Sequence, residues 1–116
     1  MERPWQITNE PEWINDCKEV VRASRGILDG SIGITEGARL LAALQFRVRA
    51  EDDSDFLLFT GIDSETGQYP LGEDRSRWDK GALARYDAER GSTEAHFKGD
   101  AEKACRSLIQ KYEDVS

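Results

Sequence analysis

The sequence predicts an all-α fold: a single four-helix domain over residues 1–116, made of a helical hairpin, a short third helix and a long C-terminal helix. Apolar residues recur at three- and four-residue spacing through most of the chain, which is the period of an amphipathic helix. Only one short apolar run could form a strand, and a lone strand is unstable without a partner. A length of 116 residues fits one domain, which buries about two-thirds of the surface that its unfolded chain exposes.

The first helix is predicted from about Glu10 to Leu28. Asn9 precedes it as an N-cap whose side chain accepts a hydrogen bond from a free backbone amide, and Glu12 is placed to complete a capping box. Gly30 supplies the left-handed residue that commonly ends a helix. A single buried face is predicted by the spacing of Trp13, Cys17, Val20, Val21, Ser24, Ile27 and Leu28.

A second helix is predicted from about Thr35 to Val48, after a tight connection at residues 31–33. The short connection makes the first two helices an antiparallel hairpin. Gly37 costs about 1 kcal/mol relative to alanine inside a helix. A glycine at such a position often allows another backbone to pack closely, so we expect the first helix to cross the second near Gly37.

The third helix is predicted to start in the charged segment 51–55, because carboxylates are favoured at the positive N-terminal end of a helix dipole. The apolar run Phe56–Phe59 follows directly. Periodicity does not distinguish a buried strand from a buried helix over so few residues. We favour a helix that reaches Ser64, followed by a loop over residues 66–72, where glycine and proline are concentrated.

The last helix is predicted from about Lys80 to Tyr112, with Asp79 as its N-cap. Its buried face is predicted by an unbroken stripe: Tyr86, Arg90, Thr93, Phe97, Ala101, Ala104, Leu108 and Tyr112. The stripe passes Gly91 and Gly99 without a change of phase. We therefore expect one long helix, in which these two glycines are the places where a kink would occur.

The net charge of −7 comes entirely from residues 51–74. Residues 1–50 carry seven acids and seven bases, and residues 75–116 carry eight acids and nine bases. The segment between them has no lysine or arginine and eight acids: Glu51, Asp52, Asp53, Asp55, Asp63, Glu65, Glu73 and Asp74. Like charges at this density cost stability unless something offsets them, and they speed the encounter with a basic protein. We interpret the segment as a binding surface for a basic partner; the alternative is an acidic region that only faces water.

The acidic segment does not have the pattern of a calcium loop. Such a loop needs glycine at its sixth position and glutamate at its twelfth. Counted from Asp52, these positions hold Leu57 and Asp63. No cysteines and histidines have metal-ligand spacing either, so we predict no metal and no cofactor.

An enzyme and a nucleic-acid-binding protein are both disfavoured. The chain has a single histidine, and neither cysteine has a histidine beside it, so no nucleophile, base and orienting group come together. An acidic chain lacks the basic stripe that phosphate neutralisation requires. Arg75 and Arg77 are too few to change this. We expect them to pair with Glu73, Asp74 and Asp79 or to stack near Trp78.

A cytoplasmic location without membrane contact is expected. No apolar run approaches the ~20 residues needed to span a bilayer, and the first residues lack the basic and apolar regions of a secretory signal. Cys17 and Cys105 both fall on apolar helical stripes. Two buried thiols in a reducing compartment are the favoured interpretation, and a disulfide between their helices is the alternative.

Two segments resemble a signature of small bacterial proteins, most of them without an assigned function. One runs from Phe59 to Thr66 (FTGIDSET) and continues as a Pro-Leu-Gly at residues 70–72 and as Arg75-x-x-Trp78. The other, LDGxIGIxEGAR at residues 28–39, resembles the hairpin turn of the same group. Some proteins of this size and charge are immunity partners of bacterial toxins, so the resemblance implies a toxin-immunity role. It implies no catalytic residue.

The leading hypothesis is therefore a non-enzymatic acidic protein that neutralises a basic partner, in its concrete form an immunity protein against a nuclease-type bacterial toxin. The eight carboxylates would mimic phosphates in a basic cleft. Tyr69 and Trp78 would be aromatic anchors, because binding hot spots favour such residues. The alternative is a cytoplasmic accessory or regulatory helical domain that forms a homodimer through its long helix.

Overall fold

The computed structural model describes residues 2–115, and over this range the protein consists of helices, turns and loops, without a strand. It has four α-helices: α1 (Glu10–Asp29), α2 (Ile34–Arg47), α3 (Ser54–Thr66) and α4 (Lys80–Tyr112). A 3-10 helix, η1 (Gly72–Arg77), lies between α3 and α4. The predicted all-α fold is confirmed, and residues 56–59 are part of a helix.

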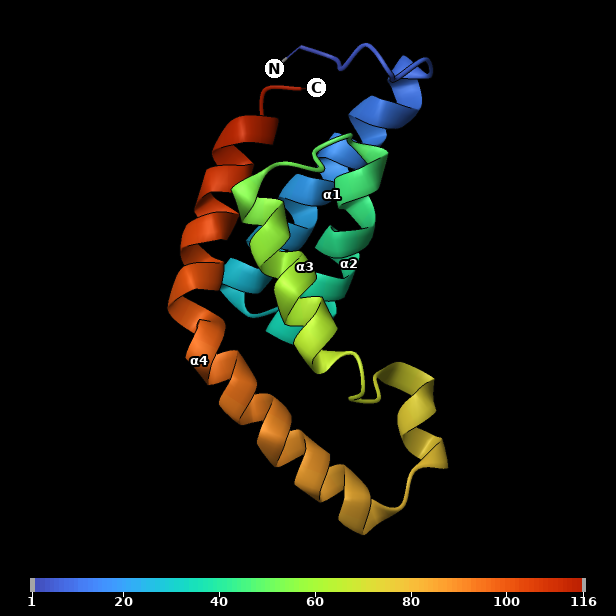
Figure 1. The fold of residues 1–116 in the computed structure, drawn as a ribbon, viewed down its shortest axis with the longest axis vertical. Coiled ribbons are helices and arrows are strands. Elements are labelled where there is room, and N and C mark those ends of the chain that lie inside the picture. The colour runs from blue at the N-terminus through green and yellow to red at the C-terminus, as the bar shows by residue number, and fades with distance from the viewer. Residues whose placement is uncertain (1, 116) are drawn as a thin grey trace.

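The four α-helices run alternately down and up in Figure 1, so each is antiparallel to the next along the chain. α1 packs against α2 and α4, and α3 packs against the same two helices from the other side. Contacts across the diagonals are sparse. The predicted antiparallel hairpin of the first two helices is confirmed, and the third and fourth helices close a bundle around one core.

The core is filled by one face of each helix. Two of its largest fully buried side chains, Phe56 and Phe59, come from α3, whereas Leu57 between them is exposed. Every member of the predicted α1 stripe is buried except Leu28, which is partly buried. Burial of a side chain of this size contributes about 1.5–3 kcal/mol, so the apolar stripes are what holds the bundle together.

α1 and α2 approach each other closely where glycine replaces a side chain. A β-carbon added to Gly37 would overlap the side chain of Ile27, and one added to Gly26 would overlap the side chain of Ile32. Both glycines are buried. The first helix does pack near Gly37, as expected, but its side chain and not its backbone makes the contact: Ile27 of α1 occupies the space that a larger residue in α2 would need.

Three α-helices are capped by the residue that precedes them. The Asn9 side chain accepts a hydrogen bond from the Glu12 amide at the start of α1, as predicted, and Asp53 and Asp79 cap α3 and α4 in the same way. The Glu12 carboxylate does not complete the predicted capping box. It lies 3.3 Å from the Arg47 guanidinium of α2 instead, and so links the two helices of the hairpin.

The start of α2 is capped from a distance. Gly33 precedes this helix and has no side chain to offer. Oε2 of Glu94, in the middle of α4, accepts hydrogen bonds from the Thr35 amide (3.0 Å) and the Thr35 hydroxyl (2.8 Å). The carboxylate therefore sits at the positive end of the α2 dipole and ties α4 to the hairpin.

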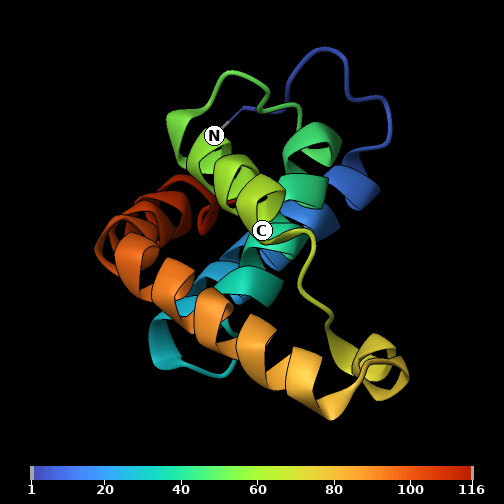
Figure 2. The ribbon, with the colours of Figure 1, turned by 60° about the horizontal axis from the view of Figure 1, so that its bottom comes forward.

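α4 continues unbroken through Gly91 and Gly99, as predicted, but only its last part enters the core. Residues 80–100 include no buried residue, and the buried ones are Ala101, Ala104, Cys105, Leu108 and Tyr112. The prediction of a buried face from Tyr86 onward is therefore wrong for the first half. The other α-helices have at most 20 residues against 33 in α4, so they end before they can cover it. Figure 2 shows the N-terminal half of α4 extending away from the other helices, with its first residues beside η1. The molecule is therefore elongated, with a long axis of 49 Å.

The connection between α3 and α4 is partly ordered as η1, a 3-10 helix that the sequence pattern does not predict. The predicted loop is limited to the residues between Thr66 and Gly72. Gly72 has a φ of +57°, the left-handed conformation for which glycine is favoured. As for membranes, none of the helices between residues 2 and 115 has the length and apolar character needed to cross one.

Candidate binding surface

The acidic segment 51–74 does not form one face of the molecule. It begins just before α3 and ends within η1. The 13 residues of α3 separate its two ends by ~20 Å, at a rise of about 1.5 Å per residue. In Figure 1 the two parts of the segment lie at opposite ends of α3. The expectation of a single negative surface is therefore corrected, because the carboxylates form separate groups.

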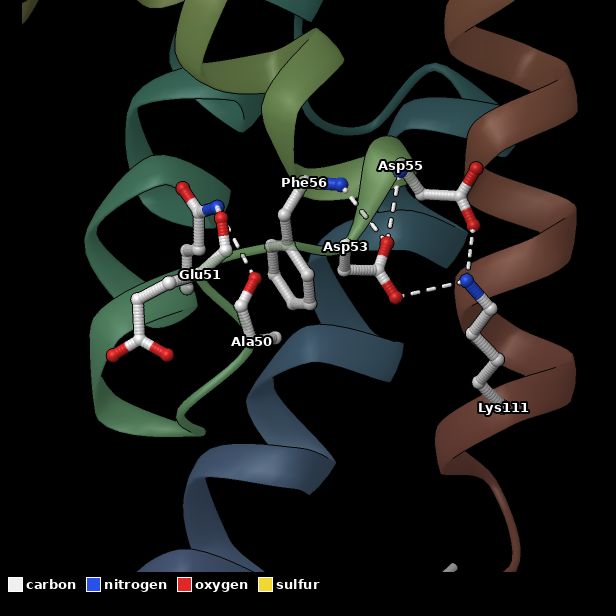
Figure 3. A network of polar contacts seen from close by, with 7 residues as sticks. Ala50, Glu51, Asp53, Asp55, Phe56 and Lys111 are labelled. Carbon is white, nitrogen blue, oxygen red and sulfur yellow. Dashed lines mark hydrogen bonds and ion pairs between the residues drawn. The ribbon is translucent and has the colours of Figure 1, made fainter. Parts of the chain in front are cut away.

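At the start of α3, Lys111 from the last turn of α4 neutralises two carboxylates (Figure 3). Its Nζ donates hydrogen bonds to Oδ2 of Asp53 (2.9 Å) and to Oδ2 of Asp55 (2.8 Å). Oδ1 of Asp53 accepts hydrogen bonds from the amides of Asp55 (2.8 Å) and Phe56 (3.3 Å), which caps the helix. The side chains of Asp53 and Asp55 are only 18% and 19% exposed. Both carboxylates stabilise the fold and are not a free surface.

The loop that leads into α3 is held by the buried side chain of Gln45. Its Nε2 donates hydrogen bonds to the carbonyls of Ala50 and Glu51, each at 3.2 Å. Its Oε1 accepts a hydrogen bond from the Thr60 hydroxyl at 2.7 Å. The amide of Gln45 thus fixes the backbone at the start of the acidic segment, and Figure 3 shows Ala50 and Glu51 in the loop that leads to Asp53.

Two more carboxylates of the segment have basic partners outside it. Glu51 lies 3.1 Å from Arg49, and Asp63 lies 3.5 Å from Arg39 of α2. Half of the eight carboxylates are therefore paired with bases that come from other parts of the chain. The segment itself contains no base, but bases from other parts of the chain lie beside it in the fold. Lys111 follows Asp53 by 58 residues, so the local sequence gives no sign of this pairing.

The other four carboxylates remain available for binding. Asp52, Glu65, Glu73 and Asp74 are exposed, and none forms an ion pair with a residue between 2 and 115. Asp52 lies at the α3 start. The remaining three, here called the η1 carboxylates (Glu65, Glu73 and Asp74), come from the last turn of α3 and from η1, which lie at the same end of the molecule in Figure 1.

The two predicted aromatic anchors differ in their accessibility. Tyr69 is 6% exposed and packs against Tyr86 of α4, with ring centroids 5.9 Å apart. Trp78 is 38% exposed and meets the same tyrosine edge-on at 5.1 Å. Tyr69 is therefore a packing residue and not an anchor on the free surface. Trp78 keeps an accessible face next to η1.

η1 is fixed to α4 by a bidentate ion pair. Arg75 Nη1 and Nη2 donate hydrogen bonds to the two carboxylate oxygens of Asp87, each at 2.7 Å. The expected pairing of Arg75 with Glu73 or Asp74 is wrong, because the guanidinium turns toward α4. This leaves both η1 acids free of Arg75. A hollow of about 300 Å³ lies beside them, lined in part by Tyr69, Asp74 and Trp78.

The structure does not assemble a set of catalytic groups from the described residues. His96 is exposed and packs edge-on against Phe97. Burial raises the pKa of Cys17 and of Cys105 to about 12, so neither thiol ionises at neutral pH. Among residues 2–115, no group of three or more histidine, cysteine, aspartate or glutamate side chains is placed to hold a metal ion.

The two cysteines are free and buried, as the favoured interpretation predicts. Cys105 lies beside Ser24 of α1, and Cys17 lies near Tyr112 of α4. Ser24 and Cys17 are about two helical turns apart, or ~10 Å along the axis. A disulfide requires Cα atoms about 4.4–6.8 Å apart, so a bond between the two thiols would need α1 to slide along α4.

Comparison with known protein families, with curated proteins and with solved structures finds no match for this chain.

Proposed function

We propose that this protein is a non-enzymatic acidic binding protein that neutralises a basic partner, most concretely as an immunity protein against a nuclease-type bacterial toxin. The observation that supports this best is that Asp74 and the accessible Trp78 line one hollow at η1, while Glu65 and Glu73 are exposed at the same end of the molecule. Carboxylates without internal partners attract a basic cleft, and an aromatic ring next to them supplies the apolar contact on which hot spots depend.

The proposed docking surface is narrower than the acidic segment. It consists of the η1 carboxylates and Trp78, with Asp52 as a separate charge at the other end of α3. Glu51, Asp53, Asp55 and Asp63 are assigned to the fold, because each has a base beside it. Three carboxylates at one end would mimic successive phosphates in the cleft of a nuclease, where phosphate contacts dominate the affinity.

The proposed compartment is the cytoplasm. Two buried thiols without a disulfide fit a reducing environment. An immunity protein acts in the compartment where its toxin would otherwise reach nucleic acid, and the proposal places both proteins there.

The gene neighbourhood provides the first test. The proposal expects an adjacent reading frame that encodes a basic, toxin-like protein whose expression alone stops growth, and whose toxicity this protein relieves. An adjacent frame that is neither basic nor toxic would count against the immunity role.

The second test measures association with a catalytically inactive form of that basic protein. The variant Glu65→Gln/Glu73→Gln/Asp74→Asn is expected to lower the association rate at least tenfold at low salt, because electrostatic steering is strongest there. The matched control Glu36→Gln/Glu89→Gln/Asp100→Asn removes the same charge from exposed sites on α2 and α4 that form no ion pair with a residue between 2 and 115. Equal effects of the two triple variants would place the docking surface elsewhere, and absence of binding by the unaltered protein would reject the function.

One observation favours the alternative, a homodimeric accessory domain. Residues 80–100 of α4 include no fully buried residue, and a half-buried stripe that includes Leu83, Tyr86 and Phe97 runs along them. A second copy could cover this stripe. Light scattering separates the two proposals: a dimer whose stability does not depend on salt supports the accessory domain, and a monomer supports the acidic binding protein.

A further inference from the structure

The protein also has a groove of about 660 Å³ whose lining contains more basic than acidic side chains. It follows α1 and is closed at its sides by the turn before α2 and by the end of α4. Its volume falls within the range of about 300–1,000 Å³ that is usual for small-molecule sites. Nothing in the proposed function uses this groove.

Three cations line the groove along one face of α1. Lys18, Arg22 and Arg25 are spaced by four and three residues, which places their side chains next to one another on a helix. Two carboxylates line the groove as well, and Asp29 is one of them; its Oδ1 already accepts a hydrogen bond from the Ser31 amide at 2.8 Å. The lining is thus positive on balance, in a chain whose net charge is −7.

The floor of the groove is apolar. Val21, Ile32 and Tyr112 contribute side chains to it. Val21 and Tyr112 are only 8% and 4% exposed, so the partly buried Ile32 supplies most of the apolar surface that a ligand can reach. A ligand that fits must therefore combine an apolar body with an anionic group at the rim.

The second carboxylate of the lining, Glu113, already occupies the place of such an anion. Its Oε2 lies 3.6 Å from Nη2 of Arg25, and both side chains are about half exposed to solvent, at 46% and 62%. Arg22 is paired with Glu19 at 2.8 Å, whereas Lys18 has no ion pair with any residue between 2 and 115. An exposed pair of this length contributes little, so a ligand carboxylate can displace Glu113 from Arg25.

We propose that this groove binds a small amphipathic anion, a carboxylate carried on a hydrocarbon chain. The carboxylate would pair with Arg25 and Lys18, since arginine offers two parallel donors to a carboxylate. The chain would lie over Val21, Ile32 and Tyr112. The inference rests on different residues from the proposed function and stands or fails separately from it.

Three ligands test the proposal. Decanoate has both the hydrocarbon chain and the carboxylate, decanol has the chain without the charge, and acetate has the carboxylate without the chain. Each is titrated into the full chain, with amide shifts followed by NMR. Decanoate is expected to bind at least tenfold tighter than decanol or acetate, with the largest shifts at residues 18–32 and 112–113. Equal affinities for decanoate and decanol, or shifts centred on another part of the molecule, would overturn the proposal.

A charge-removal variant tests the role of the three cations. Lys18→Gln/Arg22→Gln/Arg25→Gln is expected to weaken decanoate binding at least tenfold and to leave decanol binding unchanged. Lys98→Gln/Lys103→Gln/Arg106→Gln is the matched control, since these residues of α4 are exposed and do not line the groove. Equal effects of the two variants would overturn the assignment of the cations.

Removal of the competing carboxylate should act in the opposite direction. Glu113→Gln frees Arg25 and is expected to tighten decanoate binding about two- to fivefold, the range set by a weak exposed ion pair. The neighbouring Asp114→Asn makes the same change in net charge without touching Arg25. A structural defect would weaken binding, so a gain with Glu113→Gln that Asp114→Asn does not share supports the site, and no difference between them contradicts it.

Discussion

Lys111 Nζ lies 2.9 Å from Oδ2 of Asp53, so the last turn of α4 holds the residue that caps α3. The same ammonium group also donates a hydrogen bond to Asp55, which follows Asp53 by two residues. This clasp joins the end of the chain to the beginning of its third helix. It also removes two carboxylates from the surface that the sequence presents as acidic.

The substitution Lys111→Met is expected to destabilise the fold by about 1 kcal/mol. The Asp53 and Asp55 side chains would lose their shared base while they stay mostly covered, but Lys111 itself is 36% exposed, so solvent already screens part of the interaction. Urea unfolding measures the change in the free energy of unfolding. Lys98 is an exposed residue of the same helix and forms no ion pair within the described part of the chain, so Lys98→Met should change that free energy by less than about 0.5 kcal/mol.

The pH dependence of the clasp has a defined sign. Burial lowers the pKa of Lys111, but the hydrogen bonds with Asp55 and Asp53 outweigh this effect and leave the pKa raised above 10.5. A raised pKa means that the stabilisation is complete below the unfolded value of 10.5 and is lost as the pH rises through the higher folded value. Unfolding curves of the unaltered protein and Lys111→Met should therefore converge above that range and differ fully at pH 7.

The helices were predictable from the sequence because their signals are local. Asn9, Gly30 and Asp79 mark helix ends by their own chemistry, and the apolar spacing in α1 identifies its buried face. The exposed first half of α4 was not predictable, because a stripe of the same period continues where no neighbouring helix is long enough to cover it. Whether a helix face is buried depends on the lengths of the helices packed against it, and the apolar spacing of one helix carries no information about those lengths.

The candidate surface was less predictable than the fold. Lys111 and Arg39 neutralise carboxylates that are far from them in the sequence, so a count of bases within residues 51–74 could not find them. Glu94 is a similar case: it caps α2 from the middle of α4. Only the spacing of Lys18, Arg22 and Arg25 was a local signal for the basic groove, and the balanced charge of residues 1–50 concealed it.

Alanine at two glycines of the α-helices should have effects of opposite sign. Gly37→Ala gains helix propensity, but its β-carbon overlaps Ile27 in the packed crossing of α1 and α2, so a net loss of about 1–3 kcal/mol is expected. Gly91→Ala meets no atom within 4 Å and should gain up to about 1 kcal/mol. Urea unfolding of both variants makes the comparison.

A double variant checks the reason given for Gly37. Gly37→Ala/Ile27→Ala removes the overlapping atoms, so its loss should be smaller than the sum of the two single losses. If the losses add, the overlap with Ile27 is not the cause.

The ion pair between Arg75 and Asp87 is expected to control the order of η1. The hydrogen bonds from Arg75 hold the pKa of Asp87 below its ordinary value of 3.8. A lowered pKa means that the contribution is complete above pH 3.8 and is lost as the pH falls through the lower folded value. Asp87→Asn should therefore speed amide exchange in residues 72–78 at neutral pH and abolish the acid-dependent change there.

Glu89→Gln is the control for this prediction, because Glu89 is exposed on the same part of α4 and its carboxylate pairs with no base among residues 2–115. Hydrogen exchange resolved by NMR measures residues 72–78 separately from the core. Because the pair joins η1 to the half of α4 that has no buried residue, exchange of the core amides is expected to stay unchanged. Faster exchange throughout the protein would mean that η1 is part of the cooperative unit.

The two thiols should be unreactive until the bundle opens. Cys17 and Cys105 are fully buried, and burial raises the pKa of each thiol to about 12. At pH 8 an aromatic disulfide reagent should label unfolded protein in urea within minutes and leave the native protein unlabelled over hours, because only a thiolate that is accessible can react. Cys105→Ser provides the control: it should halve the label in urea. Fast labelling of native protein would show that α1 and α4 separate readily, and the register that places Cys105 beside Ser24 would then be wrong.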